Sequence, residues 1–293
     1  MYLSFTLSFV RYIILYMYKT LIDSKTLYDH LGEPKWVIVD CRFDLTDINA
    51  GKNAYLESHI PNAIFADLNT DLSDPDAIGQ GRHPLPSPGV LNALFSSMGI
   101  DSDTQVIGYD SLGGSFASRL WWMLRYMNHE AVAVLDGGWQ VWQQSGFPVS
   151  SGEEKNVPGD FHAQPRNEWL VTVDKISGAE MLIDSRDPAR YRGELEPLDR
   201  IAGHIPGAKN HFWKDNLAEN GLFKDPDDLC EVFQGILGTT LPQNAVFYCG
   251  SGVTACQNLL AAVHAGLETP RLYAGSWSEW CADPARPVAT GEV

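Results

Sequence analysis

The apolar positions of the chain are grouped in short runs of β-branched and aromatic residues. Such runs occupy residues 36–40, 105–109, 182–184 and 245–248, and segments with a helical spacing of apolar positions lie between them. Short apolar runs that alternate with helices are typical of parallel strands joined by crossover helices. The pattern therefore predicts an α/β fold in which parallel sheets are flanked by helices.

The order of these runs is repeated along the chain. His59-Ile-Pro-Asn-Ala in the first half matches His204-Ile-Pro-Gly-Ala in the second, and Leu-Asp-Gly-Gly-Trp139 matches Tyr-Ala-Gly-Ser-Trp277. The apolar runs also correspond in the same order: residues 36–40 match 182–184, and residues 105–109 match 245–248. Such ordered matches indicate a duplication. We therefore expect two tandem domains, each a parallel sheet flanked by helices.

Composition predicts where the two domains meet. Residues 150–159 are polar and rich in Gly, Ser and Pro, which is typical of a linker. We place the first domain at residues 17–150, the linker at 151–167 and the second domain at 168–293. Within the first domain, residues 69–89 are long and irregular, a feature of loops that are functional or disordered.

The first sixteen residues depart from this pattern. Residues 1–16 are apolar and aromatic, but Arg11 interrupts them and they are shorter than the roughly 20 residues that a membrane span needs. They lack the basic start and the small-residue cleavage site of a signal peptide. We expect that translation begins at Met17, that residues 1–16 are a misassigned start or an extension, and that the protein does not associate with membranes.

The charge and the cysteines limit the partners of the chain. Because 37 Asp and Glu outweigh 21 Lys and Arg, the formal net charge is -16, which disfavours binding to nucleic acid or to an anionic membrane. The five cysteines are an odd set without a Cys-x-x-Cys pair, so neither a disulfide framework nor a cysteine-rich zinc site is predicted. The reducing cytoplasm is the expected compartment, and no metal is expected.

A cysteine follows the last of the apolar runs. Cys249 opens the loop Gly-Ser-Gly-Val-Thr, which leads into a helical pattern over residues 256–264. We expect Gly250 and Gly252 to adopt backbone angles barred to other residues, so that N–H groups turn toward the sulfur. The helix N-terminus adds partial positive charge, and both effects favour the nucleophilic thiolate. The alternative is that Cys249 is a small buried apolar residue at a strand end.

The matching position of the first copy carries no thiol. Asp110 stands there, followed by Ser-Leu-Gly-Gly-Ser. A carboxylate repels an anionic substrate and cannot carry sulfur. We therefore expect the first domain to be catalytically inactive and the second to hold the single site, facing the first.

Three motifs resemble those of the tandem-domain rhodanese superfamily. They are the Cys249 loop, the paired His-Ile-Pro boxes and Gly-Ser-Trp-Ser-Glu-Trp280, and the loop is similar to that of the 3-mercaptopyruvate sulfurtransferase branch. The resemblance implies an inactive N-terminal domain, an active C-terminal domain and a site in the cleft between them. It also implies that Cys249 takes a sulfane sulfur from a small-molecule donor and becomes a persulfide. The acceptor would be a thiol, such as thioredoxin or glutathione, or cyanide, and no cofactor is required.

The charge of the loop indicates the donor. Thiosulfate-preferring loops of the superfamily resemble Cys-Arg-Lys-Gly-Val-Thr, whereas Gly250 and Ser251 bring no cation here. A singly charged donor, 3-mercaptopyruvate, fits better and would leave as pyruvate. The alternatives are a thiosulfate sulfurtransferase that forms thiocyanate and sulfite, and a rhodanese-like binding or regulatory module. A phosphatase of this fold needs an arginine six positions after the cysteine, where Ala255 stands, so that chemistry is excluded.

The resemblance also assigns roles around the loop. It implies a serine, histidine and aspartate relay in which Ser251 pairs with His83, while the acidic position falls on Asn69, with Asp67 and Asp71 nearby. The persulfide and donor would contact the rest of the loop, which comprises Gly250, Gly252, Val253 and Thr254.

Arginine is suited to binding the donor carboxylate because its planar fork accepts a bidentate partner. Arg190 matches the substrate arginine of the family. The second arginine of the family is expected after Glu196-Pro197, where Leu198 stands, so Arg200 is the candidate substitute. Arg42 and Arg186 follow an Asp at a strand end in both copies, and His59 and His204 also recur. Because these four residues occur in both copies, we expect them to be structural.

Overall fold

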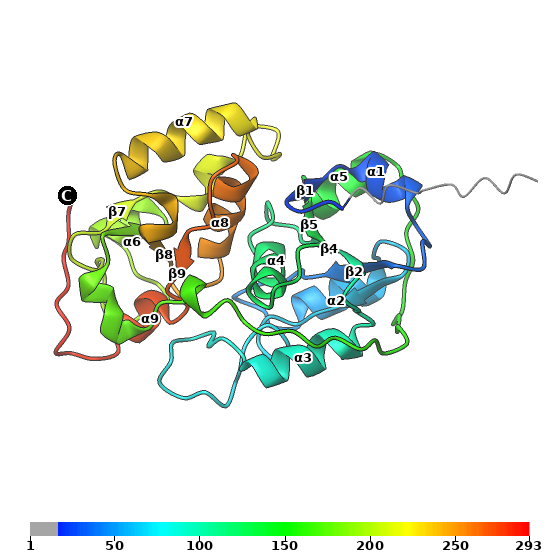
Figure 1. Ribbon diagram of the computed structural model, residues 1–293, viewed down its shortest axis with the longest axis horizontal. Helices are drawn as coiled ribbons and strands as arrows, with labels where there is room; N and C mark the ends of the chain where they lie inside the picture. The colour runs from blue at the N-terminus through cyan, green and yellow to red at the C-terminus, as the bar shows by residue number, and fades with distance from the viewer. Residues whose placement is uncertain (1–16, 293) are drawn as a thin grey trace, which may run out of the picture.

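The structure, a computed structural model, describes residues 17–292, so the expectation about residues 1–16 lies outside the described residues. The chain forms two lobes that lie side by side (Figure 1). Each lobe is built on its own parallel sheet, as the alternation of apolar runs and helical segments predicts.

The first lobe contains a five-stranded sheet in the order β1-β5-β4-β2-β3, with all strands parallel. Its elements are β1 (Leu21–Ile22), α1 (Ser24–Asp29), β2 (Trp36–Asp40), α2 (Ala50–Glu57), β3 (Ala63–Phe65), α3 (Pro88–Ser97), β4 (Gln105–Tyr109), α4 (Ala117–Tyr126), β5 (Val132–Leu135) and α5 (Gly138–Gln144).

The second lobe contains a four-stranded parallel sheet in the order β7-β6-β8-β9. Its elements are η1 (Asn167–Trp169), η2 (Val173–Gly178), β6 (Met181–Asp184), α6 (Pro188–Arg192), β7 (Lys209–Asn210), η3 (Trp213–Asn216), α7 (Pro226–Leu237), η4 (Pro242–Asn244), β8 (Ala245–Tyr248), α8 (Ala255–His264), β9 (Arg271–Leu272) and α9 (Ser276–Trp280).

The two sheets have the same topology, which confirms the duplication. The order β9-β8-β6-β7 repeats β5-β4-β2-β3, and an isolated parallel bridge between Leu170 and Leu272 corresponds to the pairing of β1 with β5. In both lobes the strand that precedes the candidate loop, β4 or β8, is central and fully buried. The ends of these two strands therefore present their loops at equivalent positions.

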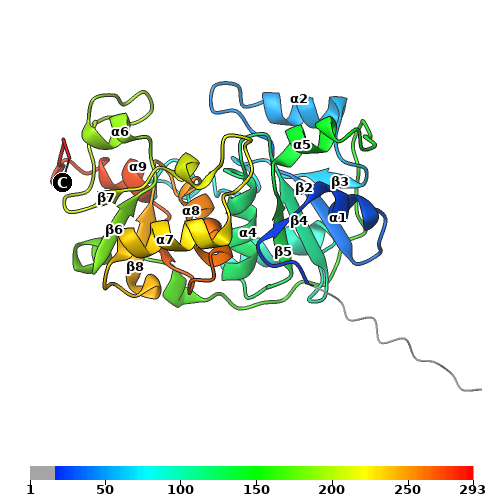
Figure 2. The same cartoon turned by 90° about the horizontal axis from the view of Figure 1, so that it is seen from above.

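The helices that follow these loops form the interface between the lobes. In Figures 1 and 2, α4 and α8 lie next to each other between the two sheets. All ten residues of α4 are buried, and one continuous apolar core includes side chains from both helices. Because α4 and α8 start at the loops of Asp110 and Cys249, packing of the two helices brings both loops to the interface.

The segment between the lobes is packed against the first one. Residues 151–166 contain no helix or strand, yet Phe161 is buried and its ring meets that of Phe95 edge-on. Arg166 Nη1 lies 2.6 Å from Glu130 Oε1. These contacts attach the segment to the first lobe along most of its length.

The repeated arginines and histidines make the same structural contacts in both lobes. Arg42 Nη2 donates to Asp40 and to the Ser58 carbonyl, and Arg186 Nη2 donates to Asp184 and to the Gly203 carbonyl, each at 2.6 Å. The histidines are fully buried, and Nδ1 of each donates to a backbone carbonyl: His59 to Tyr55 at 2.7 Å and His204 to Tyr191 at 2.8 Å. The structural interpretation of these four residues is confirmed.

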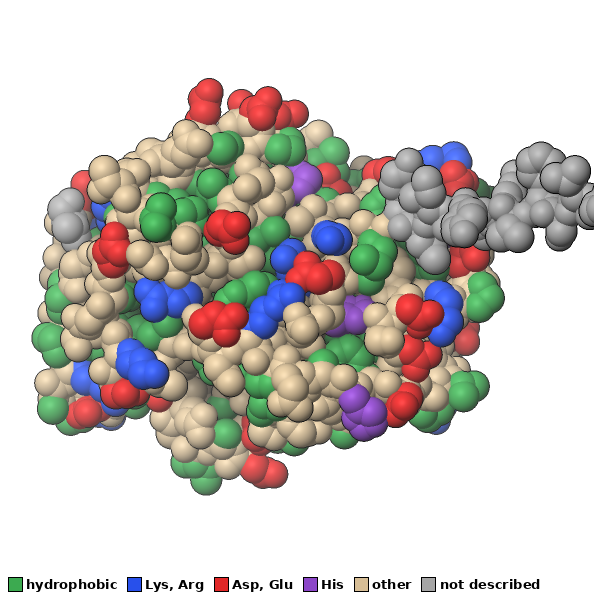
Figure 3. Space-filling model, in the orientation of Figure 1, with side chains coloured by type: hydrophobic (Ala, Val, Ile, Leu, Met, Phe, Trp, Pro, Cys, Tyr) green, Lys and Arg blue, Asp and Glu red, His purple; other side chains and the backbone are tan. Residues whose placement is uncertain are grey.

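Two surface properties bear on the predicted partners. Acidic and basic side chains are interspersed over the face drawn in Figure 3, with no extended basic patch on that face. Within residues 17–292, every helix is too short or too polar to cross a membrane.

Candidate active site

Cys249 lies at the C-terminal end of β8 with its side chain almost completely buried. Its N–H donates to Ser276 Oγ at 3.1 Å, and its carbonyl accepts from Trp277 N at 3.0 Å. The Ser276 hydroxyl in turn donates to the Tyr273 carbonyl at 2.9 Å. The segment that starts α9 therefore fixes the backbone of Cys249 on both sides.

The two glycines of the loop serve different purposes. Gly252 has a φ of 74°, and a Cβ there would lie 2.2 Å from the Ala274 carbonyl oxygen, so no other residue fits. Gly250 does not adopt such a backbone angle, and the sequence prediction was wrong on this point. A Cβ on Gly250 would lie 3.1 Å from Arg82 Nη2 and 3.5 Å from the Arg190 guanidinium. The absence of a side chain at Gly250 leaves space for two arginines to approach.

The backbone of the Cys249 loop has unused hydrogen-bond donors. Among the described residues, the N–H groups of residues 250–255 find no protein acceptor. They lie at the start of α8, whose N-terminus carries partial positive charge. N–H groups without a protein acceptor at a helix start can bind an anion, which is the role that the sequence analysis expects of them toward a thiolate.

The loop of the first lobe is closed by its own carboxylate. Asp110 accepts four backbone N–H groups, those of Leu112 at 2.7 Å, Gly114 at 3.0 Å, Phe116 at 2.7 Å and Ala117 at 2.8 Å. Burial raises the pKa of Asp110 in spite of these bonds. The Asp110 side chain therefore occupies these donors and leaves none of the four for a ligand.

Ser251 and His83 meet across the interface, as the resemblance implies. His83 Nδ1 lies 2.8 Å from Ser251 Oγ, although the two residues come from different lobes. His83 is buried, with Phe43 edge-on to its ring. Burial lowers the pKa of His83 to about 3, and the charges of Arg82 and Arg119 act in the same direction. The imidazole is therefore neutral near physiological pH.

The acidic member of the expected relay is not assembled. Asp67 Oδ1 accepts the N–H of Asn69 at 2.7 Å, and Asp71 Oδ2 accepts the N–H of Asp67 at 2.7 Å. Within the described part of the chain, none of these three residues makes a hydrogen bond to His83. Ser251 and His83 thus form a pair without a carboxylate.

A small cavity of about 60 Å³ connects the sulfur to these groups. All of the predicted site residues except Gly252 and Arg200 line it: Cys249, Gly250, Ser251, Val253, Thr254, His83 and Arg190. Leu198 also lines it, where the resemblance would place an arginine, whereas Arg200 is exposed and lies outside the lining.

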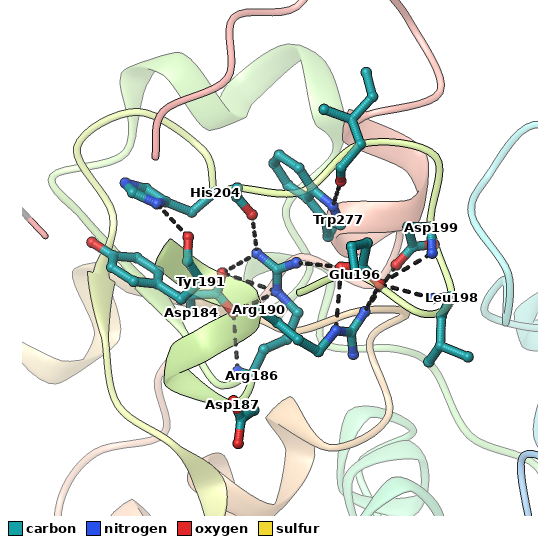
Figure 4. Close-up of polar contacts among 12 residues, drawn as sticks. Asp184, Arg186, Asp187, Arg190, Tyr191, Glu196, Leu198, Asp199, His204 and Trp277 are labelled. Atoms are coloured by element: carbon teal, nitrogen blue, oxygen red, sulfur yellow. Dashed lines mark hydrogen bonds and ion pairs between the residues drawn. The ribbon is translucent and has the colours of Figure 1, made fainter. Parts of the chain in front are cut away.

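Carboxylates hold the cations of the second lobe (Figure 4). Arg190 donates through Nε and Nη2 to Glu196, and through Nη2 to Asp199 at 3.1 Å. Arg186, behind them, donates to Asp184 and reaches Glu196 at 3.2 Å. Arg190 is therefore held in a fixed orientation at the cavity.

Two arginines of the first lobe also reach this region, and neither was singled out in the sequence analysis. Arg82 lines the cavity and pairs with Asp199 at 2.6 Å. Arg119 in α4 is fully buried and donates to the Gly252 carbonyl at 3.0 Å and to the His83 carbonyl at 3.3 Å. The only signal for Arg82 was its place next to His83 in the long loop.

Comparison with protein families identifies both lobes. The family model described as the rhodanese-like domain matches residues 23–145 and again residues 171–283. The chain belongs to the rhodanese family.

Sulfurtransferases from other organisms align with almost the whole chain. A probable 3-mercaptopyruvate sulfurtransferase of Pseudomonas aeruginosa is 44% identical, with 93% of this chain and 98% of that protein covered. A thiosulfate sulfurtransferase of Rattus norvegicus is 32% identical, with 94% and 97% covered. The solved 3-mercaptopyruvate sulfurtransferase of Leishmania major superposes with a TM-score of 0.80 at 30% identity, over 90% of this chain and 74% of that one. The rhodanese chain described here is an enzyme, a sulfurtransferase.

Proposed function

We propose that this rhodanese family member transfers the sulfur atom of 3-mercaptopyruvate to Cys249, where it is held as the sulfane sulfur of a persulfide, and then to an acceptor. The observation that carries the proposal is the cavity at Cys249, where Gly250 and Ser251 bring no charge while Arg190 offers a guanidinium to a carboxylate. A monoanionic keto acid matches one such clamp, and the similarity to two 3-mercaptopyruvate sulfurtransferases supports the same donor.

The first step is attack of the Cys249 thiolate on the sulfur of the donor. A sulfur–sulfur bond forms, the carbon–sulfur bond breaks, and its electron pair leaves on carbon as the enolate of pyruvate. The proton of the donor thiol ends on that carbon, so the products are pyruvate and an anionic Cys249 persulfide. The covalent intermediate divides one difficult transfer into two steps.

Ser251 and His83 would stabilise the leaving enolate. A neutral His83 whose Nδ1 carries the proton can donate to Ser251 Oγ, which frees the Ser251 hydroxyl to donate to the donor's keto oxygen. Charge develops on that oxygen as the carbon–sulfur bond breaks, and a preorganised donor at such a position is an efficient form of stabilisation. The unused N–H groups of residues 250–255 would hold the persulfide.

In the second step the outer sulfur of the persulfide is attacked by the acceptor. A thiol such as that of thioredoxin or glutathione would leave as its own persulfide, and cyanide would leave as thiocyanate. Cys249 returns to the thiolate in both cases. The two steps balance in electrons, so the reaction needs no cofactor.

A thiosulfate sulfurtransferase is the second candidate, favoured by the Rattus norvegicus relative. The test compares pyruvate formation from 3-mercaptopyruvate with thiocyanate formation from thiosulfate plus cyanide, in the wild type and in Cys249→Ser. We expect a strong preference for 3-mercaptopyruvate and no turnover of either donor by Cys249→Ser. A preference for thiosulfate would assign the second activity, and turnover by Cys249→Ser would refute the persulfide route.

A further inference from the structure

A buried arginine of the first lobe contacts the loops of both lobes at the site. Arg119, in α4, is fully buried and donates through Nη1 to the Gly252 carbonyl at 3.0 Å and through Nη2 to the His83 carbonyl at 3.3 Å. Its Nε donates to the Leu72 carbonyl at 3.4 Å. Because Gly252 follows Ser251, the guanidinium holds the backbone beside both members of the Ser251 and His83 pair.

The charge of Arg119 is not balanced by an acid. Within residues 17–292 it forms no ion pair, and the acceptors of its hydrogen bonds are backbone carbonyls. A buried ion is costly unless a countercharge lies near it. Burial lowers the pKa of Arg119, and negative charge on the sulfur of Cys256 or Cys249 would act in the opposite direction. An anionic sulfur is therefore the countercharge that the site can supply.

Of the two sulfurs, Cys249 is the one suited to carry the charge. Cys256 Sγ donates to the Gly252 carbonyl at 3.4 Å, and burial raises the pKa of Cys256 to about 12, so Cys256 is a neutral thiol near physiological pH. His83 is neutral as well, since burial lowers its pKa to about 3. Cys249 lines the cavity, where it becomes a thiolate or an anionic persulfide in the proposed reaction.

The other cations near this sulfur are already paired with acids. Arg82 and Arg190 line the cavity. Arg82 binds Asp199 at 2.6 Å, and Arg190 binds Asp199 at 3.1 Å and Glu196 at 2.7 Å. Among the described residues that line the cavity or bond to its loops, Arg119 is thus the cation that no carboxylate offsets.

The two copies of the domain differ at this position. Arg119 stands nine positions after Asp110, and Asn258 stands nine positions after Cys249. Asn258 is also buried, but its neutral amide donates to the His211 carbonyl at 3.0 Å within its own lobe. The first lobe therefore places a cation where the second has none, and directs it to the loop of the other lobe.

We propose that Arg119 is a positioning residue for sulfur transfer, which aligns Ser251 with His83 across the interface and supplies the countercharge of an anionic sulfur at Cys249. The inference rests on the proposed persulfide route. A guanidinium suits both tasks, because its fork reaches a carbonyl in each loop and its charge is permanent. The lobe that lacks a nucleophile thereby supports the nucleophile of the other.

The first experiment measures the rate at which iodoacetamide alkylates Cys249 as a function of pH, with the modified cysteine identified by mass spectrometry. Since the thiolate is the reactive form, the midpoint of the profile reports the charge of that sulfur. Arg119→Met should move the midpoint up by about one pH unit, so that the rate below the midpoint falls about 10-fold. Arg119→Lys keeps a charge and should restore most of the shift.

The matched control is Arg125→Met. Arg125 is a buried arginine of the same helix, but its guanidinium pairs with Glu130 at 3.2 Å and makes no hydrogen bond to either loop within residues 17–292. Its replacement should leave the alkylation midpoint unchanged.

The second experiment follows pyruvate formation from 3-mercaptopyruvate. Arg119→Met should lower kcat about 10- to 100-fold with a much smaller change of KM, because Arg119 lies outside the cavity lining. Arg119→Lys should recover only part of kcat, since it cannot bond both carbonyls with a planar fork. The deficit of Arg119→Met should shrink at about pH 9.5, where the thiolate forms without the cation, whereas a purely structural residue would leave a deficit that does not depend on pH.

The outcomes separate this inference from the function on which it rests. If the wild type forms no pyruvate, the proposed function fails, and the alkylation profile still tests the countercharge. An unchanged midpoint in Arg119→Met would overturn the proposal, and a lower melting temperature beside it would show that Arg119 only joins the lobes. If Arg119→Met does not fold, Arg119→Lys decides: a kcat equal to that of the wild type would show that the fork positions nothing and would overturn the proposal, while a lower kcat at the wild-type midpoint would support it.

Discussion

Replacing His83 by Gln should remove part of the acid sensitivity of the folded chain. Burial lowers the pKa of His83 to about 3, whereas an unfolded histidine has a pKa of about 6.5. Between these pH values the unfolded chain binds a proton that the folded chain does not. The stability linked to His83 is therefore fully present above about pH 6.5 and is lost as the pH falls toward about 3.

The size of the effect follows from the distance to the unfolded pKa. At about pH 5, which is about 1.5 units below 6.5, the loss is about 2 kcal/mol, at about 1.36 kcal/mol per unit. Burial also lowers the pKa of His129, His211 and His264. These histidines are present in both proteins and cancel in the comparison.

Urea denaturation at about pH 7.5 and about pH 5 gives the free energy of unfolding of each protein. Between these conditions the wild type should lose about 2 kcal/mol more than His83→Gln. Glutamine is chosen because its amide can still bond the Ser251 hydroxyl. His162→Gln, which removes a largely exposed imidazole, is the control and should behave as the wild type. Equal losses in the wild type and in His83→Gln would refute the assignment of a neutral, buried imidazole.

Two further substitutions test the two loops. Gly252→Ala should destabilise the fold by more than about 1 kcal/mol and abolish sulfur transfer, because its φ is 74° and its Cβ would meet the Ala274 carbonyl at 2.2 Å. Gly250→Ala, measured in the same unfolding and turnover assays, should fold normally and raise KM instead; equal unfolding free energies for both variants would contradict this distinction. Asp110→Ala should lower the free energy of unfolding by about 3 kcal/mol, because four backbone N–H groups, three of them in buried hydrogen bonds, lose their acceptor. Asp110→Asn, which keeps an acceptor oxygen, should lose less, and an unchanged urea midpoint in Asp110→Ala would argue against the carboxylate as the organiser of that loop.

The sequence predicted the features that depend on local pattern. Apolar runs and their repetition were enough to predict two parallel sheets, and the cysteine with its glycine loop indicated a segment that lines a small cavity in the structure. The pairing of Ser251 with His83 came from the resemblance. The sequence analysis missed why position 250 needs a glycine, because the reason is a tertiary contact. A backbone angle can be inferred from a loop motif, but the approach of two arginines from distant parts of the chain cannot.

Arg82 and Arg200 are a second case in which a tertiary contact could not be predicted from the sequence. Both are arginines in irregular segments, and proximity in sequence to Glu196 favoured Arg200. Arg82 reaches the cavity because Gly81 packs closely on Gly275 of the other lobe, whereas Arg200 is exposed and outside the cavity lining. No periodicity or spacing within one segment reports such a contact.

Arg119 shows how the first lobe contributes to the geometry around Cys249. This cation of α4 is fully buried, and within residues 17–292 it has no carboxylate partner. Its guanidinium bonds the Gly252 carbonyl in one loop and the His83 carbonyl in the other, so it ties the nucleophile loop to the loop that brings His83 and Arg82. Burial lowers its pKa, and negative charge on the sulfur of Cys256 or Cys249 would act in the opposite direction and offset part of the cost of burying the cation. The lobe whose own loop is closed by Asp110 thus supplies three of the groups around the sulfur.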